Sequence, residues 1–407
     1  MKRYDKLTPE GTRDLLFDEC AARRIIEERL RTIFVKNAYS EVVTPGLEFY
    51  DVFSSKTRYF SQESMYKLSD AKGRLMVIRP DTTLPIARLA ATRLRDEALP
   101  LKLFYNQNIF RINPKNNGRD DEIFQSGIEL IGGDVKLSDI EVLFLAVDAL
   151  KSCTTDDFRL EIGNSAFFKK LITKLHVSED ESEEIRSAIE NKNYPELKRL
   201  LQSIGDFPEV KALAELPKLF GGAEVFKKAY EAFAGIDDMK EPLDYLQSNY
   251  NTLCRLGISD KITVDFGLVN KANYYTGILF RGYIEGYGMS VLSGGRYDTL
   301  TDDFGADIPA TGFAVNINAV ASVMLKKAQS PLLQKPDVLV FIKDSSFDKG
   351  IHHARKIMEA GYIVDTSVIS DEEEAMTYAR KKGINRVDVF EADGSVRTII
   401  NGGKKND

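Results

Sequence analysis

Two long strand-like segments, residues 101–113 and 122–133, dominate the first half of the chain. Both are rich in apolar residues, and the break NPKNNGRDD between them is rich in Asn, Gly and Asp. A polar break of this kind between two apolar runs is typical of a loop that joins antiparallel strands. The chain is therefore predicted to contain an antiparallel hairpin of two long strands.

The rest of the first 330 residues mixes shorter strands with helices. Apolar residues recur at helical spacing over residues 17–37, and a second helix is predicted over 138–152. Residues 167–256 are highly charged and helical in pattern, which predicts a helical insertion within a core that spans 1–330. Further strands are predicted at residues 74–80, 158–163, 261–269, 274–286 and 289–298, and a buried segment that runs into a helix at 312–328.

The last part of the chain is predicted to form a separate small domain. A length of 407 residues is enough for about two or three domains. Pro331 and Pro336 mark a linker over residues 329–335, and beyond it strand-like and helix-like segments alternate. Such alternation favours a small α/β domain with a largely parallel sheet over residues 336–407. The pair His352–His353 falls on a helix of this domain, where we expect a solvated face.

Composition excludes several classes of protein. Cys20, Cys153 and Cys254 are odd in number and far apart, which excludes a disulfide framework and fits a reducing cytoplasm. With 3 histidines, a multi-histidine metal site is not expected. No apolar run approaches the ~20 residues of a membrane span, and the first residues lack the apolar core of a secretory signal. A net charge of -6 argues against a dedicated nucleic-acid binder. We therefore expect a cytoplasmic protein with no metal and no cofactor.

The strand EIFQSGIELI carries the most informative local pattern. Because side chains alternate between the faces of a strand, Gln125, Gly127 and Glu129 share one face, and the opposite face is nearly all apolar. Gly127 leaves a floor on which a small molecule could lie, and Glu129 could pair with an ammonium group. The pattern alone leaves a second interpretation open, in which this is an exposed face of the sheet.

Other clusters carry polar groups that could complete such a site. On the preceding strand, Gln107 and Arg111 share a face. The segment Arg79–Thr83 ends an apolar strand with a turn that bears an acid and hydroxyls, and Tyr274–Tyr275 open another strand. The pair Gly294–Gly295 would let the backbone approach a ligand closely.

Taken together, these segments resemble the histidyl-tRNA synthetase family of class II synthetases. The opening TPEGTRDLLFDE with its following helix is similar to motif 1, IFRINPKNNGRDDEIFQSGIE to motif 2, and TGFAVNINAV to motif 3. The segment LVNKANYYTGILF is similar to the histidine-specific segment of the family, IRPDTT to its RPEGT element, and LSGGRYDTL to its AGGRYDGL strand. Because six such segments occur in the family's order over nearly the whole chain, we expect an α+β fold with a class II synthetase-like antiparallel sheet flanked by helices.

The departures from the family pattern fall on positions that bind ATP or activate the histidine carboxylate. The motif 3 arginine is replaced by Ala319, and the arginine implicated in activating the histidine carboxylate is replaced by Asn270. The motif 2 loop continues with the acids Asp120, Asp121 and Glu122. Adenylate formation needs cations against the developing phosphate charge, and one lost donor of this kind typically costs ~10²–10³ in rate. We therefore expect no catalytic residues and almost no activation of histidine.

The amino-acid half of the family's site is better preserved. Asp81 replaces a family glutamate, which shortens its reach by one methylene group. The resemblance implies that histidine binds to Asp81, Thr83, Arg111, Gln125, Glu129, Tyr274 and Tyr275. Within this set we expect Glu129 to receive the α-ammonium group and the two tyrosines to lie near the imidazole.

A synthetase-like body with a broken ATP site resembles the branch of the family that regulates ATP phosphoribosyltransferase. That resemblance implies a non-catalytic subunit, needed for the activity of a short-form catalytic subunit and for feedback by L-histidine in the first step of histidine biosynthesis. It also implies self-association to a dimer through the helix at 17–37. Residues 331–407 hold 12 basic and 13 acidic residues, so tRNA binding is not expected. Two alternatives remain open: a true synthetase with unusual motifs, and a histidine-sensing module for another partner.

Overall fold

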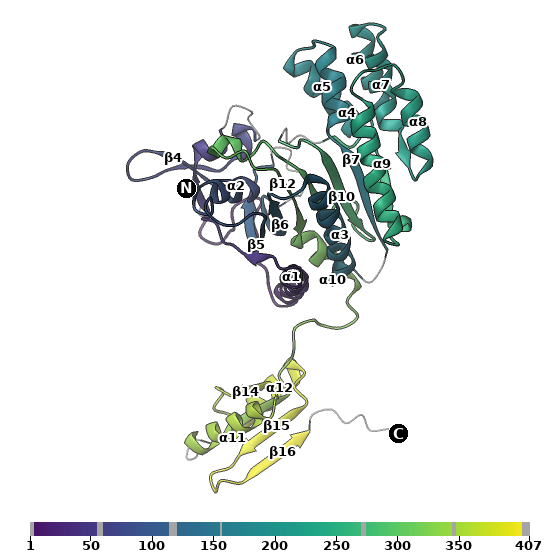
Figure 1. The fold of residues 1–407 in the computed structure, drawn as a ribbon. Helices are drawn as coiled ribbons and strands as arrows, with labels where there is room; N and C mark the ends of the chain where they lie inside the picture. Colours follow the sequence, from purple (N-terminus) through teal and green to yellow (C-terminus); the bar gives the residue numbers. More distant parts are fainter. Residues whose placement is uncertain are drawn as a thin grey trace. The chain divides into compact units, whose positions relative to one another are not determined.

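The computed structural model describes residues 4–54, 60–113, 120–154, 157–269, 274–343 and 347–400. The chain divides into two compact units, Met1–Ala328 and Gln329–Asp407. Each unit has its own sheets and helices, and the two are described separately (Figure 1).

A nine-stranded sheet forms the centre of the first unit, in the order β1-β5-β6-β12-β11-β10-β7-β9-β8. Its long hairpin is the one predicted from the sequence, with Tyr105 opposite Gly127. All neighbouring strands are antiparallel except the pairs β1–β5 and β7–β9. The predicted antiparallel sheet is therefore confirmed. The strands are β1 (Ser40–Glu41), β5 (Leu101–Phe110), β6 (Glu122–Ile131), β7 (Phe158–Asn164), β8 (Phe220–Gly221), β9 (Ile262–Asp265), β10 (Ile278–Ile284), β11 (Leu292–Arg296) and β12 (Ala310–Asn316).

Helices cover both faces of this sheet. On one face lie α1 (Asp18–Lys36), α3 (Val135–Cys153) and α10 (Ile317–Lys327), and the ring of Phe34 packs against Phe104 and Phe313. On the other face lies α2 (Thr83–Thr92) beside a small antiparallel sheet. That small sheet consists of β2 (Leu47–Phe49), β4 (Leu75–Ile78) and β3 (Lys67–Ser69). Single turns of 3-10 helix lie at Tyr50–Val52, Gln62–Ser64, Leu216–Lys218, Ser259–Lys261 and Asp302–Phe304.

Only part of the apolar stripe on α1 is used by the unit's own core. Ile26, Leu30 and Phe34 are fully buried, whereas Ile25 and Ile33 are half-buried. Acids in the first turn of the helix and a lysine in the last complement the helix dipole. The half-buried isoleucines leave apolar surface on the outer side of the helix, and the dimer expected from the sequence stays a prediction.

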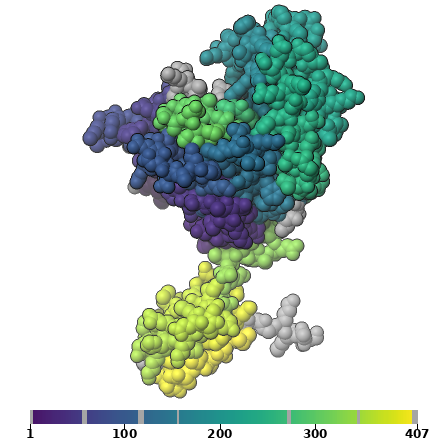
Figure 2. All heavy atoms as spheres, viewed as in Figure 1, coloured from purple at the N-terminus to yellow at the C-terminus, as the bar shows by residue number. Residues whose placement is uncertain are grey.

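The insertion is a group of helices joined to one edge of the sheet, and Figure 2 shows it along one side of the unit. It packs on the core through α9, where the Tyr245 hydroxyl donates to the Asp139 carboxylate on α3 at 2.7 Å. No strand was predicted within the insertion, but Phe220–Gly221 forms the short strand β8 at the edge of the sheet, where it pairs with β9. The helices are α4 (Ala166–Lys174), α5 (Glu179–Glu190), α6 (Tyr194–Ile204), α7 (Pro208–Glu215), α8 (Glu224–Ala232) and α9 (Lys240–Arg255).

Several strands are shorter than the sequence pattern predicts, and two of them, β9 and β10, border the candidate site. The strand expected at 261–269 ends at Asp265, because the Asp265 carboxylate accepts from the Gly267 amide at 2.8 Å and turns the chain. The strand expected at 274–286 begins only at Ile278. Tyr274 and Tyr275 therefore lie in the segment that leads into β10 rather than in a strand.

The second unit is a four-stranded sheet in the order β14-β13-β15-β16, parallel except for the pair β15–β16. This confirms the predicted small α/β unit. His353, which was expected on a solvated face, lies 3.1 Å from the fully buried carboxylate of Asp388, and that expectation was wrong for this residue. Its elements are β13 (Val338–Ile342), α11 (Phe347–Glu359), β14 (Val364–Thr366), α12 (Glu372–Lys382), β15 (Arg386–Phe390) and β16 (Val396–Ile400).

Truncating the buried face of α1 should strongly destabilise the first unit. Leu30→Ala removes a fully buried side chain, and a substitution of this kind costs about 2–5 kcal/mol of the free energy of unfolding. Val35→Ala on the exposed side of the same helix is the matched control and should change it by less than about 1 kcal/mol. Urea unfolding followed by circular dichroism measures both, and equal effects would contradict the packing described for α1.

Candidate binding site

Glu129 is the carboxylate at the centre of the candidate site. It lies on β6, opposite Leu103 of β5 and Gly312 of β12. A Cβ atom at position 312 would lie 2.1 Å from Glu129 Oε2 and 2.3 Å from the Ile128 carbonyl oxygen. Glycine at this position therefore makes the space that the carboxylate occupies.

Two hydroxyl groups hold the Glu129 carboxylate. Thr83 Oγ1 donates to Glu129 Oε1 at 2.7 Å, and the Tyr297 hydroxyl donates to Oε2. The residue is 1% exposed, and burial raises the pKa of Glu129 to about 8. The two hydrogen bonds oppose this rise, and the nearby Asp81 carboxylate adds to it. A pKa of about 8 keeps this carboxyl group mostly protonated at neutral pH.

The floor that was expected to be open above Gly127 is filled by the Tyr105 side chain. A Cβ atom at position 127 would lie 2.7 Å from both the Tyr105 ring and its hydroxyl oxygen. The ring reaches this place because Tyr105 is the cross-strand partner of Gly127 in the β5–β6 register. Gly127 makes room for a tyrosine of the protein itself, so a ligand has to lie beside that ring.

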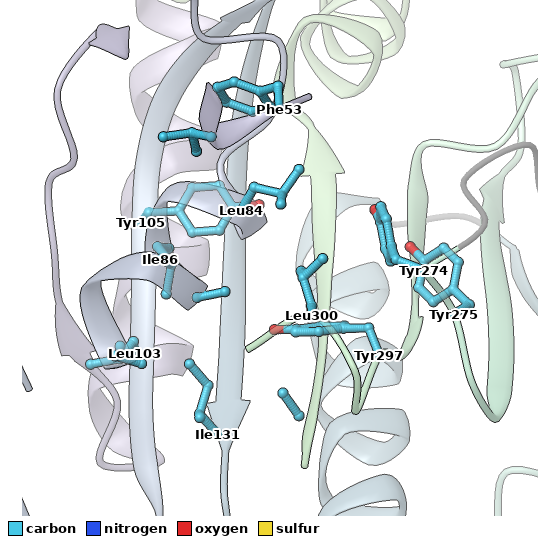
Figure 3. Close-up of a cluster of buried hydrophobic side chains, with 14 of the residues drawn as sticks. Phe53, Leu84, Ile86, Leu103, Tyr105, Ile131, Tyr274, Tyr275, Tyr297 and Leu300 are labelled. Carbon is cyan, nitrogen blue, oxygen red and sulfur yellow. The ribbon is translucent and has the colours of Figure 1, made fainter. Parts of the chain in front are cut away.

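Three further tyrosines form an aromatic wall around this cluster. The ring centroids of Tyr274 and Tyr275 lie 4.6 Å apart, and Tyr297 meets Tyr274 edge-on at 6.1 Å. Figure 3 shows Tyr274 and Tyr275 side by side, within the same buried cluster as Tyr105 and Tyr297. All four are at least nine-tenths buried. The arrangement suits a flat, partly polar group that can be enclosed by rings.

Asp81 and Arg111 form the second charged group of the site. Arg111 Nη2 lies 3.1 Å from Asp81 Oδ2, and Arg111 Nε donates to the Pro80 carbonyl at 2.6 Å. Burial raises the pKa of Asp81, and the Arg111 guanidinium opposes that rise. The Arg111 side chain is 39% exposed, so this arginine is the part of the cluster that faces solvent.

The predicted residues do not all meet at one point. Gln125 is half-buried and lies on the same face as Glu129, but four residues along a strand separate them by about 13 Å. The Gln107 side chain, directly opposite Gln125, has a buried amide nitrogen with no partner among the described residues. The site therefore has a deep end at Glu129 and a polar end at Gln125.

Sequence reasoning missed three residues of the site: Tyr105, Tyr297 and Gly312. Tyr105 lies two positions before Gln107 and so on the same predicted face, which was a usable signal. Tyr297 was part of the quoted motif LSGGRYDTL but received no role. The closeness of Gly312 to Glu129 follows from the pairing of β12 with β6, which no local pattern reveals.

The acids of the motif 2 segment each have a partner within the protein, and their place relative to ATP stays a prediction. Asp121 is buried, accepting from the Tyr66 hydroxyl at 2.6 Å and from the Asn113 amide at 3.0 Å. Glu122 accepts from the Asn108 side chain at 2.6 Å, and Asp120 lies 3.7 Å from Arg13. These carboxylates serve local structure.

Ala319 stands near the start of α10 and is buried. The small side chain therefore leaves no cation at the position of the family's motif 3 arginine. The other departure noted from the sequence, Asn270, lies outside the described residues.

Comparisons with known proteins fit this architecture. A family model described as histidyl-tRNA synthetase matches residues 11–320. A protein of Clostridium botulinum named ATP phosphoribosyltransferase regulatory subunit is 38% identical over 391 residues, covering 95% of this chain and 92% of its own. The protein of the same name from Clostridium acetobutylicum is 39% identical and covers 98% of both chains. The chain belongs to the family of ATP phosphoribosyltransferase regulatory subunits.

Solved structures show the fold of this family of regulatory subunits. A chain from Bacillus halodurans, described as an ATP phosphoribosyltransferase regulatory subunit/histidyl-tRNA synthetase, is 28% identical with a TM-score of 0.81, covering 93% of this chain and 97% of its own. A histidyl-tRNA synthetase from Nostoc superimposes with a TM-score of 0.78 over 98% of this chain and 97% of its own. At 20% identity the second match shows the shared fold alone.

Replacing the buried carboxyl group should stabilise the protein at neutral and mildly alkaline pH. The folded state holds a proton on Glu129 up to pH about 8, whereas the unfolded state releases it near the ordinary pKa of 4.5. The free energy of unfolding therefore falls by about 1.4 kcal/mol per pH unit between roughly pH 5 and 8. Glu129→Gln removes this loss, and Tyr297 and Thr83 can still donate to or accept from the amide.

Urea unfolding of wild type and Glu129→Gln at several pH values between 5 and 8 measures this difference. The gap between the two should widen as the pH rises. Glu97→Gln, on the exposed surface, is the control and should follow wild type throughout. A constant gap between Glu129→Gln and wild type would show that the buried carboxyl group titrates normally.

Proposed function

We propose that this chain is a non-catalytic regulatory subunit of ATP phosphoribosyltransferase, required by a short-form catalytic subunit and responsible for its feedback by histidine. The full-length similarity to relatives of that name, at 38% and 39% identity, carries the proposal. Its partner would be the catalytic subunit in the cytoplasm, and no tRNA is involved. The absence of a cation at Ala319 supports a role without adenylate chemistry, because nothing there would stabilise developing phosphate charge.

The purified chain is expected not to activate histidine. Histidine-dependent exchange of pyrophosphate into ATP should stay at background, because stabilising contacts to the phosphates are missing. An active histidyl-tRNA synthetase assayed in parallel is the positive control. Exchange above background that is lost in Arg111→Ala would support the alternative of a true synthetase.

We further propose that histidine binds between Glu129 and Gln125, with the imidazole ring toward Glu129. Glu129 and Gln125 lie at separate ends of the site. One histidine can therefore contact both only if its imidazole ring and its amino-acid group bind to different residues. The flat ring fits among Tyr105, Tyr274 and Tyr275, where an ammonium group would lose most of its hydration. The ammonium group then lies toward Asp81 and Gln125, and the carboxylate toward the exposed Arg111, with Thr83 holding Glu129 in place.

Entry of histidine requires movement of the aromatic wall. Glu129 and the four tyrosines around it are all at least nine-tenths buried, so a ring can reach Glu129 only if one of them moves. Tyr274 and Tyr275 are the candidates, because they lie in the segment before β10 and outside the sheet. Thr83 and Tyr297 hold the carboxyl group from the side of the core.

The pH dependence of histidine binding tests this orientation. When the imidazole ring binds to Glu129, the two groups share one proton. Free imidazole has a pKa of about 6.5, and Glu129 has a pKa of about 8. Between these two pH values the unbound groups also hold one proton in total, which is on Glu129. The dissociation constant should therefore be flat in this range. The dissociation constant should rise at lower pH, where binding must release a proton, and at higher pH, where binding must take up a proton.

Calorimetric titrations of the chain with histidine from pH 5.5 to 9 measure this profile. An ammonium group bound to Glu129 would instead displace the proton at every pH below 8. Affinity would then increase about tenfold per pH unit up to that point. Such a slope would reverse the orientation proposed for histidine while leaving the site itself in place.

Reconstitution with the short-form catalytic subunit tests the function as a whole. Addition of the chain should raise the rate of ATP phosphoribosyl transfer, and histidine should then lower it. Glu129→Gln should keep the activation and require at least about tenfold more histidine for inhibition, since a hydrogen bond to a charged or shared-proton group is lost. Glu97→Gln should behave as wild type.

Two outcomes of the reconstitution would contradict the proposals. Failure to activate the catalytic subunit would contradict the regulatory role. Full activation with an unchanged response to histidine in Glu129→Gln would instead place the inhibitory histidine elsewhere, such as the contact between the two subunits.

A further inference from the structure

Strand β16 lies at one edge of the four-stranded sheet in the second unit (Figure 1). It pairs with β15 without a bulge, from Phe390 opposite Val396 to Arg386 opposite Ile400. Within the part of the chain that the structure describes, no strand pairs with its other side. The free edge of a strand presents amide and carbonyl groups that can bind a further strand.

Alternate residues of β16 direct their main-chain groups to this free edge. The Glu391 amide donates to the Ser395 carbonyl oxygen at 2.9 Å, which makes these two residues a hydrogen-bonded pair beside the turn. Such pairs recur at every second residue of an antiparallel ladder. Arg397 and Ile399 therefore bond to β15 through their main-chain groups. The other residues of β16 point theirs outward.

Nothing in the sequence of β16 blocks this edge. Natural proteins protect exposed edges with proline, lysine or bulges, and β16, with the sequence VRTII, has none of these. Its one charged residue, Arg397, donates to Glu372 at 2.6 Å and to Glu391 at 3.0 Å. On the opposite face of the strand, Val396 is 38% exposed and Ile400 is 65% exposed. The edge thus combines free main-chain groups with uncovered apolar side chains.

A second copy of β16 fits this edge in antiparallel register, with Thr398 on the two-fold axis. Val396 then lies opposite the partner's Ile400, and the outward groups of both copies can form about six main-chain hydrogen bonds. β-Branched side chains that lie opposite one another stabilise such a pair. The Thr398 hydroxyl already donates to Asp388 at 2.8 Å, so it needs no partner at the axis.

Other registers of two β16 strands are less favourable. A shift by two residues in one direction places Arg397 opposite the partner's Arg397, and like charges directly opposite are destabilising. A shift by two residues in the other direction leaves Val396 of each copy with no residue of β16 opposite it. A shift by one residue brings outward groups against residues whose main-chain groups already bond to β15. The register centred on Thr398 is therefore favoured.

Pairing of β16 with a second β16 also closes the assembly. The opposite edge of the same sheet is the shorter strand β14 (Val364–Thr366). If β16 of one chain paired with β14 of another, each end of the pair would keep a free edge, and the contact would continue as an open chain of sheets. Pairing of β16 with itself covers the longer edge in both copies and leaves only the short one free.

We propose that β16 is an interface between two copies of this chain, which joins the sheets of their second units antiparallel into one continuous sheet. The interface lies entirely within the second unit. It is therefore separate from the dimer predicted at α1 and from the site proposed for histidine, and it goes beyond the regulatory role.

Cysteine cross-linking of the full chain tests this register. Val396→Cys and Ile400→Cys are made separately in a chain that carries Cys20→Ser and Cys254→Ser, because these two native cysteines are not buried. Opposite residues of a hydrogen-bonded pair have Cα atoms about 5.5 Å apart, which a disulfide can span. Co-expression of the two variants and mild oxidation should therefore give a disulfide-linked dimer on a non-reducing gel. Either variant alone should give at least about tenfold less, because its two cysteines would lie about 13 Å apart.

Val368→Cys in the same background is the control for random collision, since this side chain is 99% exposed and lies outside the sheet. Circular dichroism and maleimide labelling confirm that each variant is folded with a reactive thiol. The proposal is overturned if the co-expressed variants cross-link no more than Val368→Cys, or if either variant alone cross-links as well as the pair. An edge that binds the catalytic subunit instead gives the first of these results. Because neither histidine nor the catalytic subunit is present, the result is independent of the regulatory role.

Discussion

A single buried carboxyl group, that of Glu129, organises the centre of this protein. An isolated charge cannot be left in such a place, because removing a carboxylate from water costs several kcal/mol even after relaxation. The group avoids this cost because its raised pKa favours the neutral form, and the fold surrounds it with a hydroxyl from α2, the hydroxyl of Tyr297 directly after β11, and a glycine on β12 that gives the carboxyl group room. Three distant segments of the chain are therefore tied to one side chain.

The same arrangement explains why the site is aromatic. Tyrosine rings exclude water from Glu129, which raises its pKa, and their hydroxyls supply polar partners that an aliphatic wall would lack. A proton-sharing ligand such as an imidazole suits these surroundings better than a fixed charge.

Periodicity allowed the sequence to predict the strands and the common face of Gln125, Gly127 and Glu129, because the alternation of side chains is a local property. What lies above that face was not predictable in the same way. Tyr105 fills it by register across β5 and β6, and Tyr297 reaches Glu129 from 168 residues away. The early end of β9 depends on the turn made by Asp265, which an apolar pattern does not reveal.

The order of the strands makes the insertion more than an added domain. Strands β7 and β9 are parallel neighbours, and parallel neighbours need a crossover rather than a hairpin. The insertion supplies this crossover, and its last helix, α9, packs on α3 before the chain enters β9. The helical insertion is therefore also the connection that returns the chain from β7 to the strand beside it.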